Sequence, residues 1–102
     1  MKWDVVVRPE VGEGVTEAAA WYDGHCQGLG DKFVGEVLRA FDVLALNPLI
    51  NCRRHPGKNI RWCYPRRFPY RIIYEVLESK HTVIIVAVLH GARHEQHWRK
   101  RV

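Results

Sequence analysis

The spacing of apolar residues changes near residue 59, and this change constrains the fold more than any other feature. Between residues 15 and 45, apolar side chains recur every three or four residues, which is typical of helices with one buried face. After residue 59, they alternate with polar residues or run together, as in strands. The sequence therefore predicts a helical part followed by most of a sheet.

The first half predicts an antiparallel pair of helices. One apolar stripe starts at Val15 and reaches Cys26, after a flexible lead-in at Gly12 and Gly14. Residues 28–30 (GLG) are expected to turn the chain between the two helices.

The second helix of the pair carries a longer apolar stripe, which ends at Ala45. Asp31 is a candidate N-cap for it, because a carboxylate can accept the N–H groups that a helix start leaves without partners. Asn47-Pro48 is expected to end it, since proline cannot continue the hydrogen-bond ladder.

Four segments predict strands, at residues 3–8, 60–64, 68–76 and 82–90. The last is nearly all apolar and β-branched, as expected of a central strand that is covered on at least one face. The first must join the sheet at an edge or beside the central strand. The order β-α-α-β-β-β predicts an α+β fold in which a helical hairpin packs on a small, mainly antiparallel four-stranded sheet.

Length and cysteine content exclude several classes of protein. The 102 residues fit one domain of ordinary size, spanning 1–102. Three cysteines without a C-x-x-C pair argue against a disulfide scaffold and against a thiolate zinc site. No apolar run approaches the roughly 20 residues of a membrane span, and the N-terminus lacks a signal-peptide layout. We therefore expect a cytoplasmic protein without a metal or cofactor.

Charge is distributed unevenly along the chain. Sixteen lysine and arginine residues against eleven acidic ones give a net charge of +5. Residues 1–50 hold four basic and eight acidic residues, whereas residues 51–102 hold twelve basic and three acidic ones, a net charge of +9. This asymmetry predicts a basic face that meets an anionic partner, either nucleic acid or an acidic protein.

Seven basic residues follow one another with aromatic residues among them and no acidic residue between: Arg53, Arg54, Lys58, Arg61, Arg66, Arg67 and Arg71. If Ile60, Trp62 and Tyr64 face the helices, alternation puts the basic residues of this hairpin on the opposite, open face. Arg61 and Arg71 would then lie together. Guanidinium groups bind phosphate through paired charge-assisted hydrogen bonds, so this face is a candidate RNA cradle. The alternative is a solvated face that only keeps the protein soluble.

Several segments in a fixed order carry a family resemblance: residues 21–22 (WY), 28–33 (GLGDKF), 68–74 (FPYRIIY) and 86–90 (VAVLH), then Arg93 and Trp98. Together they resemble the RelE/ParE superfamily of toxins from bacterial type II toxin–antitoxin modules, including the plasmid-stabilisation type. The resemblance spans about residues 6–101. The superfamily fold, a helical hairpin on a small antiparallel sheet, agrees with the fold predicted above.

The resemblance implies a toxin that a small cognate antitoxin neutralises within a hetero-oligomer. One branch of the superfamily inhibits DNA gyrase, and this ParE-like action is the primary expectation. The alternative is the RelE-like branch, which cuts mRNA on the ribosome as a metal-independent endoribonuclease. A further alternative is a degenerate member that has lost toxicity. An acidic antitoxin would complement the basic half of the chain and could block the basic face directly.

The resemblance also implies site residues. In RNA cleavage the 2′-OH attacks the adjacent phosphate, so the site must stabilise a dianionic transition state and deliver a proton to the leaving oxygen. Arg71 and Arg93 match positions where RelE-like nucleases keep basic catalytic residues. The candidate contacts to RNA or to another target are Lys58, Arg61, Arg66, Arg67 and Trp98.

The C-terminal segment departs from the nuclease pattern. RelE-like nucleases often carry a tyrosine a few residues after the final arginine, and this chain has none there. His94 and His97 are the candidate catalytic groups instead, with Glu95 between them, and Trp98 is more typical of ParE-type members. The same histidines and His90 have helical spacing, but no carboxylate or thiolate ligand is clearly placed beside them, so no metal site is predicted.

Structural alternatives accompany three of these residues. Arg71 can pair with Glu75 along one face of its strand. Arg93 can anchor the C-terminal turn. Trp21 lies off the apolar stripe of the first helix, so it either fills the edge of a groove or marks the surface where the antitoxin binds.

Overall fold

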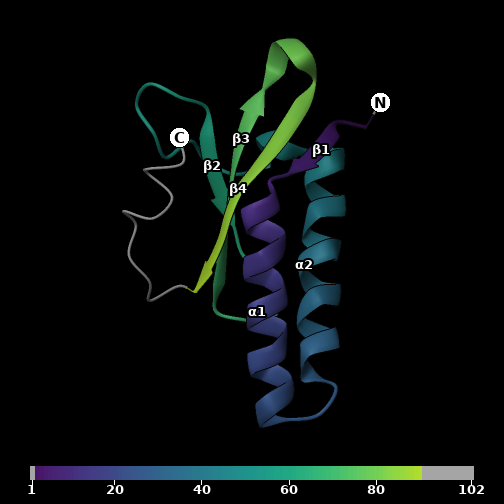
Figure 1. The fold of residues 1–102 in the computed structure, drawn as a ribbon. Coiled ribbons are helices and arrows are strands. Elements are labelled where there is room, and N and C mark those ends of the chain that lie inside the picture. Colours follow the sequence, from purple (N-terminus) through teal and green to yellow (C-terminus); the bar gives the residue numbers. More distant parts are fainter. Residues whose placement is uncertain (1, 91–102) are drawn as a thin grey trace.

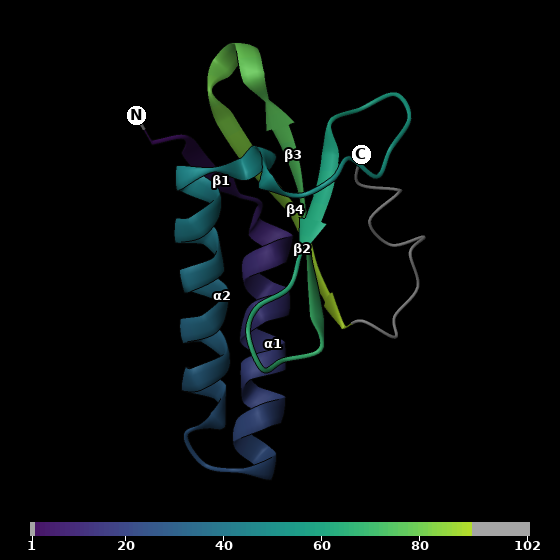
Figure 2. The same cartoon turned by 180° about the vertical axis from the view of Figure 1, so that it is seen from behind.

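The computed structural model describes residues 2–90 and confirms the α+β fold. Two antiparallel helices cover one face of a four-stranded sheet (Figures 1 and 2). The elements in chain order are β1 (Asp4–Val7), α1 (Pro9–His25), α2 (Leu29–Leu46), the 3-10 helix η1 (Pro48–Ile50), β2 (Ile60–Cys63), β3 (Tyr70–Leu77), the 3-10 helix η2 (Glu78–Lys80) and β4 (Thr82–His90).

Helix α1 begins at Pro9 rather than at Val15. The flexible lead-in predicted at Gly12 and Gly14 is therefore wrong, because both glycines lie inside the helix. Proline suits the first helical turn, where its missing N–H costs no hydrogen bond and its fixed φ favours the helix. Val11 is buried and ties this first turn to the core. That contact outweighs the weak helix propensity of the glycines.

The turn between the helices depends on two glycines. Gly28 has a φ of 87°, in the left-handed region that glycine adopts without strain. It occupies the N-cap position of α2, so the capping role expected of Asp31 is wrong. The N–H of Gly30 donates to Asp23 Oδ1 at 2.8 Å, and a Cβ at Gly30 would collide with the carbonyl oxygen of Ala19. The close approach of α1 and α2 therefore requires glycine at this position.

The strands lie in the order β1-β4-β3-β2, so β4 is central and β1 lies beside it at an edge. β1 runs parallel to β4, whereas the β2–β3 and β3–β4 pairs are antiparallel. The β3–β4 register shifts between Ile73 and Tyr74, where β4 contributes one extra residue. This bulge lets two successive residues, Val86 and Ala87, join the same apolar cluster.

Both faces of the sheet are apolar. The face toward the helices belongs to the larger cluster of buried side chains, which includes Phe33 and Tyr74. The face away from the helices carries a second, smaller cluster, against which Trp62 and Leu89 pack. Its fully buried members are Ile60, Ile73, Val86 and Ala87. The sheet thus carries buried apolar side chains on both faces. The side to which each strand turns its apolar residues therefore determines the side of its arginines.

Candidate functional site

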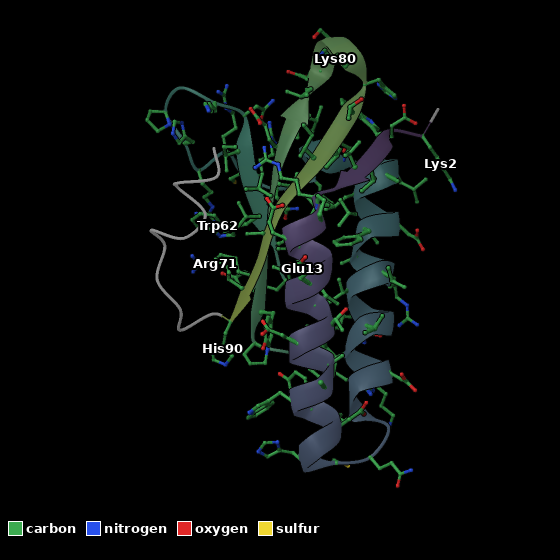
Figure 3. The ribbon with its side chains drawn as sticks, viewed as in Figure 1. Lys2, Glu13, Trp62, Arg71, Lys80 and His90 are labelled. Carbon is green, nitrogen blue, oxygen red and sulfur yellow. The ribbon has the colours of Figure 1, made fainter. Side chains whose placement is uncertain are left out.

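The face of the sheet away from the helices carries an aromatic ring in contact with two arginines, which we call the Trp62 cluster: Arg54, Trp62 and Arg71. The guanidinium carbon of Arg71 lies 4.4 Å from the centre of the Trp62 ring, and that of Arg54 lies 4.8 Å from it. Figure 3 shows Trp62 and Arg71 near each other, on the side of the sheet away from both helices. The cluster therefore offers two positive charges and an aromatic surface in one place.

Strand register places Trp62 and Arg71 on this face. Trp62 lies opposite Ile73 in the β2–β3 pair, and Arg71 lies opposite Leu89 in the β3–β4 pair. Residues directly opposite each other in antiparallel strands point to the same side of a sheet. Both partners belong to the cluster of apolar side chains away from the helices, so Trp62 and Arg71 share that side.

Arg54 is not among the site residues predicted from the sequence. Its backbone N–H donates to the carbonyl oxygen of Ile60 at 2.7 Å, and the backbone of Arg53 forms an isolated antiparallel β-bridge with that of Arg61. The chain thus folds back around the Pro56-Gly57 turn and brings Arg54 beside β2 and Trp62. That turn is the signal in the sequence that points to this contact.

Arg61 lies on the other side of the sheet, so the predicted row of guanidinium groups is wrong. It lies opposite Tyr74, which belongs to the helix-facing cluster. Its Nη1 donates to the carbonyl oxygens of Leu49 at 2.9 Å and Asn51 at 2.5 Å, and its Nε donates to Asn59 Oδ1 at 2.9 Å. Arg61 therefore holds η1 and the chain after it in place.

The prediction that Ile60, Trp62 and Tyr64 face the helices is also wrong. Ile60 and Trp62 belong to the cluster away from the helices, whereas Cys63 packs toward the helices. Tyr64 lies beyond the end of the strand and is exposed. Because both faces of the sheet are apolar, the apolar residues of an edge strand can face either way.

The other predicted contact residues come from loops on either side of β2. Lys58 is exposed, and its N–H donates to His55 Nδ1 at 3.0 Å. Arg66 and Arg67 are exposed in the turn after β2, where Arg67 has a φ of 70°. Arg66 lines a groove against α2, on the helix side of the sheet. The predicted residues Arg93, His94, His97 and Trp98 lie outside the described residues, as does Glu95.

A hollow of about 850 Å³ lies between α1 and the end of β4. It is lined by Trp21, by His90 and by glutamates of α1 that include Glu13 (Figure 3). The Trp21 side chain is exposed. Trp21 therefore lies at the edge of a groove, which is one of the two positions expected for it.

Burial alters ionisation on the helix-facing side of the sheet. It raises the pKa of the Cys63 thiol to about 11, so the thiol stays protonated at neutral pH. Burial also raises the pKa of the Tyr74 phenol, whose hydroxyl donates to the carbonyl oxygen of Pro48 at 2.7 Å. Neither group is therefore suited to nucleophilic or proton-transfer chemistry near neutral pH.

The Trp62 cluster stabilises charge but moves no proton. Guanidinium groups stay protonated in proteins, and the indole N–H is a donor only. Within residues 2–90, no group of three or more histidine, cysteine or acidic side chains is placed to hold a metal ion. No helix in that part of the chain is long and apolar enough to cross a membrane.

Comparison with known proteins places the chain in a family. Residues 5–95 match the family model of the ParE toxin of the type II toxin–antitoxin system parDE. A search of curated proteins found no match.

Solved RelE structures share the fold. The isolated E. coli RelE toxin has a TM-score of 0.65 and 16% sequence identity, over 96% of this chain and 94% of that one. A double arginine-to-alanine mutant of E. coli RelE in the free state has a TM-score of 0.65 and 17% identity, over 100% and 99% of the chains. The archaeal RelE–RelB complex from Pyrococcus horikoshii OT3 has a TM-score of 0.56 and 17% identity, over 92% and 100%.

At such low identity these structures establish the fold alone. The family model goes further, because it spans both helices and every strand of the sheet apart from Asp4 at the start of β1, including Trp62 and Arg71. The chain belongs to the ParE toxin family of type II toxin–antitoxin systems.

Proposed function

We propose that this toxin stops growth by binding DNA gyrase and that a cognate antitoxin holds it inactive in a hetero-oligomer. The matching family model is that of the parDE toxin, and a ParE-like action on gyrase is what the sequence resemblance implies. A toxin of this kind acts by occupying a surface of its protein target. Such a toxin therefore needs a surface that is complementary to its target in shape and charge, but it needs no group that transfers a proton.

The position of Arg61 supports a binding toxin most strongly. A nuclease site gathers cations around a developing dianion and also supplies a proton carrier. Arg61 is bonded to backbone carbonyl groups on the helix side of the sheet, whereas Arg71 lies on the other side. Among the described residues, the Trp62 cluster therefore supplies positive charge but no proton carrier.

The antitoxin is expected to be a small acidic protein whose gene lies beside this one. The chain has a net charge of +5, and residues 51–102 alone have +9. Complementary charge speeds the encounter of two proteins and selects the right partner. The P. horikoshii RelE that shares this fold was solved in complex with RelB, which is the kind of assembly we propose here.

Ribosome-dependent cleavage of mRNA is the second candidate, and the Trp62 cluster favours it. Guanidinium groups bind phosphate, and a tryptophan ring stacks on an unpaired base. Arg71 and Arg93 would stabilise the transition state, and His94 or His97 would carry the proton.

Controlled expression without the antitoxin separates the candidates. We expect arrested growth, loss of plasmid supercoiling or DNA breaks, and messages with uncut ends. Codon-positioned cuts that disappear in Arg71→Ala and Arg93→Ala, but persist in the control Lys80→Ala, would establish the nuclease instead. A folded chain, checked by circular dichroism, that leaves growth unchanged would identify a member that has lost toxicity.

A further inference from the structure

Five large apolar side chains lie exposed at one end of the helical layer, and we call them the α2–η1 patch: Val43, Leu46, Leu49, Ile50 and Tyr64. Their exposed fractions run from 39% for Leu49 to 66% for Leu46 and Ile50. Val43, Ile50 and Tyr64 line a groove of about 290 Å³ between α2, η1 and the chain after β2. Monomeric proteins seldom leave so many large apolar side chains together in water, so the patch indicates a binding surface.

Hydrogen bonds from two strands fix the η1 part of the patch. Arg61 Nη1 donates to the carbonyl oxygens of Leu49 and Asn51. The Tyr74 hydroxyl donates to the Pro48 carbonyl at 2.7 Å and accepts from Asn51 Nδ2 at 3.0 Å. A surface that is already ordered loses little conformational entropy when a partner binds. Arg61 therefore holds the η1 part of the patch in place before a partner binds.

The charges around the groove are positive on balance. Glu36 and Arg39 form an ion pair in which the glutamate side chain is 15% exposed and the arginine side chain 64%. Arg66, the other charged residue that lines the groove, is exposed. A partner therefore meets two guanidinium groups and a largely covered carboxylate, which favours an acidic partner.

We propose that the α2–η1 patch binds an apolar segment of the cognate antitoxin that is flanked by acidic residues, which rests on the antitoxin proposed above. Apolar side chains of that segment fill the groove beside Val43 and Ile50, and its carboxylates meet Arg39 and Arg66. A second copy of this chain fits less well, because a two-fold interface sets the same positive rim against itself.

The patch and the Trp62 cluster lie on opposite sides of the sheet. Cys63, which packs toward the helices, lines the groove of the patch, whereas Trp62 packs with the cluster away from the helices. An antitoxin segment on the patch therefore leaves the Trp62 cluster uncovered. Variants of the patch should therefore lose antitoxin affinity without altering the contacts of the Trp62 cluster.

Titration calorimetry of the full chain with the purified product of the adjacent small gene tests the proposal. Val43→Asp and Ile50→Asp each put a carboxylate into the apolar groove, and we expect each to weaken binding about tenfold or more. Leu38→Asp is the matched control, because Leu38 is 54% exposed, against 51% for Val43, and lies about 140° around α2 from it. It should change affinity less than about twofold.

The outcomes separate the inference from the proposed function. Unchanged affinity in both patch variants overturns the inference and leaves the antitoxin in place. No binding by the unaltered chain overturns the antitoxin itself, and the inference with it. Self-association of the unaltered chain that Ile50→Asp abolishes, with antitoxin affinity unchanged, assigns the patch to a second copy and also overturns the inference.

Discussion

The two faces of the sheet use arginine in different ways. On the helix side, three oxygen acceptors hold the guanidinium group of Arg61, one in η1 and two in the chain between η1 and β2. On the other side, Arg71 and Arg54 both contact the Trp62 ring. The same residue type is a structural support in one place and part of a charged aromatic surface in the other. Counting the basic residues of a segment therefore does not measure its capacity to bind a ligand.

The two faces also differ in how many of the described side chains are buried against them. Among residues 2–90, the buried members of the helix-facing cluster come from α1, α2, β3, β4 and the turn before β3, whereas those of the other cluster come from β2, β3 and β4. A side chain between a sheet and two helices has close-packed neighbours in every direction. We therefore expect the helix-facing side to dominate stability.

Truncation of adjacent core residues gives the largest expected effect. Ile72 and Ile73 are neighbours in β3 and fully buried, but they belong to opposite clusters. Each change to alanine should cost about 2–5 kcal/mol, with Ile72→Ala nearer the upper end because its surroundings can collapse less into the cavity. Urea unfolding followed by circular dichroism measures both. Equal losses, or a larger loss for Ile73→Ala, would show that the two faces contribute alike.

The two arginines provide the next largest effect. Arg61→Ala leaves the carbonyl groups of Leu49 and Asn51 without this donor and should cost about 1–3 kcal/mol. Arg71→Ala removes a contact with a ring and should cost about 1 kcal/mol. The unfolding free energies of the two variants decide the order. A greater loss of unfolding free energy in Arg71→Ala than in Arg61→Ala would show that Arg71, and not Arg61, is the arginine that supports the structure.

The order of elements could be predicted from the sequence because it depends on local spacing. The helical stripes, the Asn47-Pro48 stop after α2 and the apolar central strand all correspond to what the structure contains. The start of α1 could not be predicted this way. Gly12 and Gly14 look like breaks when propensity is taken alone, and only the burial of Val11 shows why the helix continues through them.

The orientation of Arg61 could not be predicted because it depends on a face of the sheet that no single strand reveals. β2 has four residues, and its phase follows from which apolar cluster Ile60 joins. The continuous apolar run in β4 did contain a signal, since strands that are buried on both faces read this way. A second apolar face in β4 would have allowed Ile60 and Trp62 to point away from the helices.

The smallest expected effect concerns one proton on the helix-facing side. Burial raises the pKa of Cys63 from 9.0 to about 11, so the unfolded chain releases this proton at a lower pH than the folded chain does. The resulting stability is complete below pH 9 and is lost as pH rises through about 11. Cys63→Ala should therefore flatten the fall in unfolding midpoint between about pH 8 and pH 10.5. Cys52→Ala, at an exposed thiol, is the control and should leave that fall unchanged. An equally steep fall in Cys63→Ala would assign the alkaline sensitivity to other groups, of which Tyr74, with its raised pKa, is the first to test by Tyr74→Phe.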